Sequence, residues 1–165
     1  NFLPIQKVTS GLVDYSPGPG ARSLSINGLP LVGPLICYEI IFPSEVVNPI
    51  QPPDWILNLT NDAWYGETAG PHQHLEITRI RAIERGVPVI RSANTGISAV
   101  IDPYGRVLDR LELNQSGSID FYLPASIPER TLFHYVENKL FLIFVSLWIV
   151  ALLMVFRRKR SYTAQ

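Results

Sequence analysis

The sequence predicts an α/β layered domain followed by an apolar C-terminal helix. Within the first 130 residues, fourteen prolines and eleven glycines divide the chain into short segments. The order strand, strand, helix and three further strands mixes parallel crossovers with hairpins, which is typical of α/β layers. The last part of the chain is instead a long uncharged run. At 165 residues the chain is long enough for one domain with a hydrophobic core.

The first elements expected are a hairpin and two strands. SLSING at 23–28 carries an Asn-Gly turn, and the apolar run before Cys37 predicts a buried strand. PSEVV at 43–47 predicts a short helix that the prolines of 48–54 end. WILNLT at 55–60 predicts the second strand, which leads into a long loop.

HQHLEITRIRAIERG is the best helix pattern of the domain. Ile77, Ile80 and Ile83 recur at a spacing of three, and Gly86 marks the C-terminal end. Three segments rich in β-branched residues follow, with a PYGR turn between the last two. The strands expected there are 87–93, 96–102 and 106–113.

LFLIFVSLWIVALLMVF at 140–156 is seventeen residues without a charge. A bilayer-spanning helix needs roughly 20 apolar residues, with a lower limit near 17, so this run predicts a transmembrane helix. A buried core helix is the alternative, but the run has no polar stripe. The expected division is a domain over 1–135, a transmembrane helix with its flanks over 136–158, and a tail over 159–165.

Charge and cysteine usage restrict the class of protein. Fourteen basic and fourteen acidic residues balance, so no nucleic-acid partner is expected. One cysteine excludes an intrachain disulfide. The basic run RRKR at 157–160 predicts a cytoplasmic C-terminus, with the domain on the opposite side of the membrane. Because the chain begins at Asn1 without a signal-peptide pattern, we expect it to be a piece of a longer protein.

Cys37 is the candidate nucleophile. It ends an apolar run and directly precedes Tyr38 and Glu39. In α/β folds, reactive groups lie where strands end, and a cysteine reacts as its thiolate. Glu39 alone disfavours a thiolate, so a positive partner from elsewhere in the chain is required. The alternative is a buried cysteine that packs as a small hydrophobic residue.

Two further stretches carry polar side chains at strand ends. NLTNDAWYG at 58–66, with Asn61 and Trp64, is either an Asx turn beneath an aromatic side chain or part of a site. His72 and His74 lack a third ligand nearby, so no zinc site is expected.

Arg91 ends an apolar strand. A buried arginine requires a carboxylate partner, and Glu84 or Glu39 are the candidates.

Taken in order, ICYE, NLTNDAWYG, GPHQH and RAIERGVPVIRSANTGISAVIDPYGRV resemble the carbon–nitrogen hydrolase (nitrilase) superfamily. The resemblance runs from about residue 17 to the C-terminal helix. It implies part of a four-layer α-β-β-α sandwich and a Glu–Lys–Cys triad in which Cys37 is the nucleophile. It further implies that Tyr38, Glu39, Asn61 and Trp64 shape the site. The site is expected to use no metal and no cofactor.

Within that superfamily, C-Y-E followed by a C-terminal membrane helix is most similar to acyltransferases that act on lipoproteins. The resemblance implies that Cys37 takes an acyl chain from a membrane phospholipid as a thioester. The acyl chain then passes to the α-amino group of the N-terminal diacylglyceryl-cysteine of an apolipoprotein. The implied location is a bacterial inner membrane, with a periplasmic domain and a cytoplasmic C-terminus.

The other two members of the triad are expected upstream of Cys37. Lys7 is the only lysine there, and its setting PIQKVTS does not match the family's lysine segment. We therefore expect this chain to be inactive by itself. Two alternatives remain open from the sequence: an amidase or nitrilase acting on a small C–N substrate, and a non-catalytic membrane-tethered domain.

Overall fold

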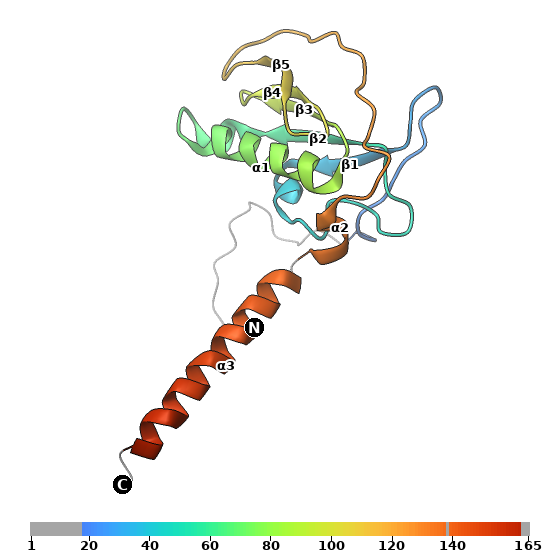
Figure 1. Cartoon of the computed structure of the whole chain (residues 1–165). Helices are drawn as coiled ribbons and strands as arrows, with labels where there is room; N and C mark the ends of the chain where they lie inside the picture. Colours follow the sequence, from blue (N-terminus) through green and yellow to red (C-terminus); the bar gives the residue numbers. More distant parts are fainter. Residues whose placement is uncertain (1–17, 138, 163–165) are drawn as a thin grey trace.

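The structure is a computed structural model that describes residues 18–137 and 139–162. Residues 1–17, which include Lys7, lie outside the described part. Figure 1 shows one β-sheet with helix α1 across one face and helix α3 leading away from the domain. The α/β layering predicted from the sequence is confirmed by this arrangement.

The sheet has five strands in the order β1-β2-β3-β4-β5. The first three are parallel, which requires crossover connections, and β4 and β5 add to them as antiparallel neighbours. The strands are β1 (Val32–Ile36), β2 (Trp55–Asn61), β3 (Val89–Asn94), β4 (Ser98–Ile101) and β5 (Val107–Leu111). All five lie within or close to the segments predicted as strands.

Two predictions at the start of the domain need correction. The hairpin at 23–28 is reduced to a single antiparallel bridge between Leu24 and Val32. The short helix expected at 43–47 is absent, and turns occupy that segment. A run of five residues followed by closely spaced prolines is too short to form a stable helix. The helical turn lies earlier, as the 3₁₀ helix η1 (Cys37–Ile41).

Helix α1 (Gly70–Arg85) confirms the predicted helix, and Gly86 ends it in the left-handed conformation. The isoleucines do not form its buried face, because Ile80 and Ile83 are 45% and 49% exposed. A spacing of three falls about 60° short of a full turn at each step, so the isoleucines drift off the sheet-facing side. The residues buried on α1 are Pro71, His74, Leu75, Thr78, Arg81 and Ala82.

The hydrophobic core lies between α1 and the sheet. Ile56, Val89 and Ile101 are aligned across three neighbouring strands and are fully buried. They form one cluster with Leu75 and Ala82 of α1. Burial of these side chains holds α1 against the strands whose ends carry the site described below.

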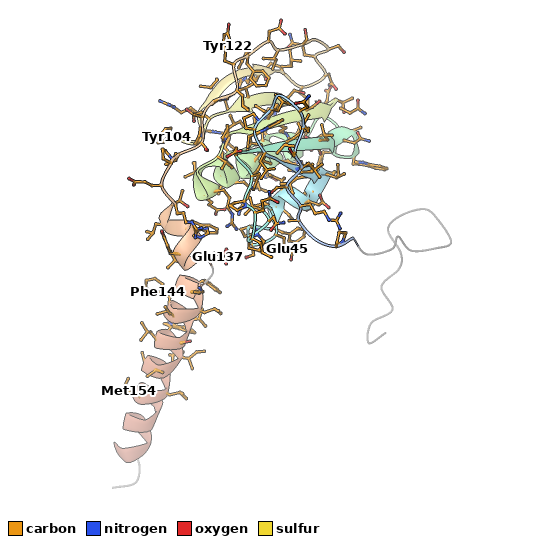
Figure 2. The ribbon with its side chains drawn as sticks, turned by 90° about the vertical axis from the view of Figure 1, so that its right-hand side faces the viewer. Glu45, Tyr104, Tyr122, Glu137, Phe144 and Met154 are labelled. Atoms are coloured by element: carbon orange, nitrogen blue, oxygen red, sulfur yellow. The ribbon has the colours of Figure 1, made fainter. Side chains whose placement is uncertain are left out.

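Helices α2 (Leu132–Val136) and α3 (Lys139–Tyr162) follow the domain. Figure 2 shows Phe144 and Met154 on α3, at a distance from the sheet. The helix runs to Tyr162 and so includes the start of the segment 159–165 that was expected to be a tail. Across the residues that the structure describes, no helix combines the length and the apolar character needed to cross a bilayer. The transmembrane helix predicted for 140–156 is therefore not found.

The buried face of α1 gives a first testable prediction. Leu75→Ala should lower the free energy of unfolding by about 2–4 kcal/mol, because it leaves a cavity against the sheet. Ile80→Ala, on the half-exposed side, should lower it by about 1 kcal/mol or less. Urea denaturation of both variants measures the difference. A larger loss for Ile80→Ala would place the isoleucine face against the sheet instead.

Candidate active site

Cys37 lies where β1 ends and η1 begins, and it is half-buried. Its φ is 52°, in the left-handed region that non-glycine residues rarely adopt. Such strained positions occur most often at functional sites, where the surrounding structure holds them. The strand register explains the geometry: Ile36 pairs with Leu59, and the chain leaves β1 at the next residue. Cys37 Sγ then lies 3.3 Å from Thr60 Oγ1 on β2.

Behind Cys37 lies an ion pair between two fully buried side chains. Arg91 Nη2 on β3 donates to Asp62 Oδ2 at 2.5 Å. The rest of the guanidinium is also satisfied, since Nη1 donates to Asn58 Oδ1 at 2.5 Å and Nε to the Ile97 carbonyl at 3.2 Å. A buried charge pair with complete hydrogen bonding avoids most of the penalty of leaving water.

The carboxylate of Asp62 has two further partners. His74 Nδ1, from α1, lies 3.0 Å from Asp62 Oδ1, and Thr60 Oγ1 donates to the same oxygen at 3.0 Å. Because a carboxylate oxygen only accepts, we assign the proton of the imidazole to Nδ1. Arg91 Nη2 also lies 3.1 Å from this nitrogen, but it can only donate, so with this proton in place it bonds Asp62 and not His74. We call Asn58, Thr60, Asp62, His74 and Arg91 the polar cluster.

The predicted partners of Arg91 were wrong. Glu84 pairs with Arg81 on its own helix. Glu39 accepts a hydrogen bond from the Ile36 amide at 2.7 Å and stabilises the start of η1. The true partner, Asp62, stands in the loop after β2, and the parallel pairing of β2 with β3 brings it to Arg91.

The electrostatics of the pair follow from burial and charge. Burial raises the pKa of Asp62, but the His74 hydrogen bond and the charge of Arg91 lower it by more, so the pKa lies below its usual 3.8. Burial lowers the pKa of Arg91, and negative charge on Asp62 and on Cys37 acts in the opposite direction.

Two hydrogen-bonded connections tie Cys37 to the polar cluster. Asn58 Nδ2 donates to the Cys37 carbonyl at 3.2 Å, while Asn58 Oδ1 accepts from Arg91. Thr60 reaches Sγ and is itself bonded to Asp62. The backbone and the sulfur of the candidate nucleophile are therefore both positioned by the Arg91–Asp62 pair.

Aromatic rings border the cluster. The ring of Tyr38 lies 5.5 Å from that of His74, and the ring of Tyr65 lies 6.2 Å from it. Burial, followed by the charges of Tyr38, Asp62 and Cys37, raises the pKa of Tyr65 above its usual 10.0. Tyr65 is therefore a neutral phenol at physiological pH.

The four residues expected to shape the site occupy different environments. Tyr38 is 48% exposed and packs on His74, whereas Glu39 caps η1. Asn61 caps the 3₁₀ helix η2 (Asp62–Tyr65) by accepting from the Ala63 amide, which is the predicted Asx turn. Trp64 is 83% exposed. Their roles in the site stay predictions.

Sequence reasoning did not identify the buried polar residues as a group. Asn58 and Thr60 are two residues apart on β2, so the strand directs both to the face that carries Arg91, and Asp62 follows directly after the strand. This polar alternation in NLTND was the signal that could have identified them. The described residues contain no group of three histidine, cysteine or acidic side chains that could hold a metal ion.

Comparisons with known proteins identify the family of the chain. Residues 8–127 match the carbon–nitrogen hydrolase family. The chain belongs to this family, and its α/β domain with a mixed sheet is the part of the fold that the described residues form.

Within the family, the chain is similar to enzymes named apolipoprotein N-acyltransferase. It is 45% identical over 138 residues to that of Rickettsia prowazekii and 51% identical over 127 residues to that of Bradyrhizobium diazoefficiens. These alignments cover 84% and 77% of the chain. They cover 28% and 23% of the relatives, so the chain spans about a quarter of their length.

Solved structures of amidases are also similar. An amidase from a Nesterenkonia species is 25% identical, with a TM-score of 0.48, over 62% of this chain and 42% of that one. A carbon–nitrogen hydrolase superfamily protein from Xanthomonas campestris is 23% identical, with a TM-score of 0.47, over 61% and 43%.

The lowered pKa of Asp62 predicts a pH-dependent contribution to stability. The ionised carboxylate contributes fully above the unfolded value near 3.8, and this contribution is lost as the pH falls from about 4 through the folded pKa. Asp62→Asn should therefore lower the free energy of unfolding by about 3–5 kcal/mol at pH 7, because it leaves Arg91 buried without its counter-charge. The difference from wild type should shrink at pH 3.

Urea denaturation at both pH values measures this difference. Burial raises the pKa of Asp102 and its hydrogen bonds with Arg106 lower it by more, so this group titrates in the same range. Asp102 is present in both proteins, so its contribution to the free energy of unfolding cancels when the two are compared. The exposed Asp109→Asn serves as the control. A penalty for Asp62→Asn that is the same at pH 7 and pH 3 would contradict a stabilising role for the ionised carboxylate.

Proposed function

We propose that this chain supplies the nucleophile of an acyltransferase that moves a fatty acyl chain from a phospholipid to the N-terminal amino group of an apolipoprotein. The observation that carries the proposal is the setting of Cys37. Its sulfur is partly accessible on a strained turn, and hydrogen bonds to its sulfur and to its carbonyl hold it in place. The names of the similar relatives supply the substrate classes.

The proposed reaction has two steps. The Cys37 thiolate attacks the ester carbonyl of the phospholipid; a thioester forms, and the lysophospholipid leaves as an alkoxide that takes up a proton. The amino group of the diacylglyceryl-cysteine then attacks the thioester. An amide forms, the thiolate leaves, and the attacking nitrogen gives up its proton. The thioester splits one difficult acyl transfer into two easier steps.

The described residues bring a hydroxyl, that of Thr60, into hydrogen-bond contact with Sγ. A general base and a cation for the oxyanion are still required. We propose that the glutamate and lysine implied by the family resemblance come from a further part of the polypeptide, and that the chain alone is inactive. The relatives, which are roughly three times as long as this chain, leave room for such a part.

The proposal also includes the surfaces that the domain leaves open. Ile36 and Leu59 are paired neighbours on the sheet face opposite α1 and are 58% and 42% exposed. We propose that a second sheet covers this face, as in a four-layer α-β-β-α sandwich. The apolar side chains of α3 are exposed as well, and we propose that they contact lipid at the bacterial inner membrane.

The central prediction concerns an acyl adduct. In the full-length protein with phospholipid, Cys37 should carry a hydroxylamine-sensitive acyl group, visible by mass spectrometry of the tryptic peptide. Cys37→Ala and Cys37→Ser should lose at least 1,000-fold in acyl transfer, because the covalent intermediate cannot form.

The same measurement separates the alternatives. An adduct formed from a small amide, with none formed from phospholipid, would favour the amidase. A wild-type protein that forms neither adduct would refute both enzymatic hypotheses and favour a binding domain without catalytic activity.

The lipid contact is tested by flotation. The full-length protein should float with phosphatidylethanolamine–phosphatidylglycerol vesicles, and Phe144→Asp with Trp148→Asp should reduce the bound fraction several-fold, because charged side chains are costly among acyl chains. Tyr104→Asp, at an exposed position on the domain, is the matched control. Equal flotation of all three proteins would show that α3 does not contact lipid.

A further inference from the structure

Thr60 occupies a position between the sulfur of Cys37 and the carboxylate of Asp62. Its Oγ1 lies 3.3 Å from Cys37 Sγ and 3.0 Å from Asp62 Oδ1, and the residue is 8% exposed. A hydroxyl has a single proton and can accept as well as donate. It therefore donates to one of these two neighbours at a time.

The protonation state of the sulfur decides which neighbour receives that proton. A neutral thiol can donate its own proton to Oγ1, and Thr60 then donates to Asp62. A thiolate only accepts, so the hydroxyl turns toward the sulfur. Asp62 remains hydrogen-bonded when it loses the bond from Thr60, since Arg91 and His74 still donate to its two oxygens.

We propose that Thr60 is a positioning residue for the nucleophile proposed above. Its hydroxyl orients the neutral thiol and stabilises the thiolate, and Asp62 holds that hydroxyl in place. The inference rests on Cys37 being the nucleophile, but it concerns the thiol itself and can be tested without any acyl substrate. In this arrangement the Arg91–Asp62 pair acts on the sulfur indirectly, through the side chain of Thr60.

Strand pairing explains why the side chain of Thr60 can reach the sulfur of Cys37. Ile36 and Leu59 form the last pair of β1 and β2, so Thr60 is the first residue of β2 that β1 leaves unpaired. Cys37 turns away in a left-handed conformation, which leaves its side chain beside the hydroxyl. The side chain of Thr60 shares a strand face with Asn58, which binds the Cys37 carbonyl.

The test is the rate at which Cys37 reacts with iodoacetamide in the full-length protein, followed by mass spectrometry of its peptide from pH 5 to pH 10. Thr60→Val keeps the shape of the side chain and removes the hydroxyl. It should slow alkylation about five- to tenfold at pH 7 and move the half-maximal rate to higher pH, as expected for losing one hydrogen bond of average strength. Thr60→Ser keeps the hydroxyl and should stay within twofold of wild type.

Thr78→Val is the matched control. Thr78 is also a buried threonine next to Arg91, and its Oγ1 accepts from Arg91 Nη1 at 3.3 Å. It has no hydrogen bond to the sulfur or to Asp62, so its loss should destabilise the fold without changing the alkylation profile. Thermal unfolding of each variant confirms that the protein compared is folded. All variants keep the ionisable groups whose charges interact with Cys37 or with its neighbours, which are Tyr38, Asp62, Tyr65, His74 and Arg91.

An unchanged alkylation profile for Thr60→Val would overturn the inference. Equal changes in Thr60→Val and Thr78→Val would also overturn it, because they would reflect general loosening of the cluster. The acyl-adduct measurement is separate. If wild type forms no adduct, the proposed function fails while the alkylation comparison still decides the role of Thr60.

Discussion

The ion pair between Arg91 and Asp62 is the interaction on which the rest of this domain depends. Both side chains are inaccessible to solvent, and removing either one would leave a buried charge at a cost of about 3–5 kcal/mol. The surroundings are arranged to satisfy the pair. Helix α1 turns His74 toward it, and Gly96 approaches so closely that a Cβ there would lie 2.6 Å from the Cβ of Asp62. The need to satisfy the Arg91–Asp62 pair explains why α1 buries the polar side chain of His74.

The same pair determines the geometry of Cys37. Its left-handed backbone is strained, and a strained residue persists only where neighbouring contacts hold it. Asn58 bonds its carbonyl and Thr60 its sulfur, and each of these side chains is itself fixed by one member of the pair. A nucleophile held at two points has less conformational freedom to lose when a substrate binds, which is how proximity lowers a reaction barrier.

The sequence predicts the elements of the fold better than the contacts between them. Strands and the end of α1 at Gly86 follow from local signals: β-branched runs, turn residues and a glycine after the last helical residue. The partner of Arg91 does not, because Asp62 follows a different strand and only the parallel register of β2 and β3 brings the two together. The isoleucine spacing indicates a helix correctly but does not identify its buried face, since a hydrophobic pattern cannot reveal that polar residues are buried. Cys37 was identifiable as a candidate, whereas the polar residues that hold it required the structure.

A buried ion pair is rarely the most stable solution, because an apolar replacement of similar volume is often neutral or stabilising. The ion pair in this core nevertheless has a role that apolar side chains could not fill. Only groups that donate and accept hydrogen bonds can reach both the carbonyl and the sulfur of Cys37, and such groups need charged or polar partners of their own when buried. The chain of contacts from Arg91 through Asn58, and from Asp62 through Thr60, provides these partners within the core. If Cys37 is the nucleophile, as we propose, the polar part of this core serves to position one thiol, while the apolar cluster stabilises the domain.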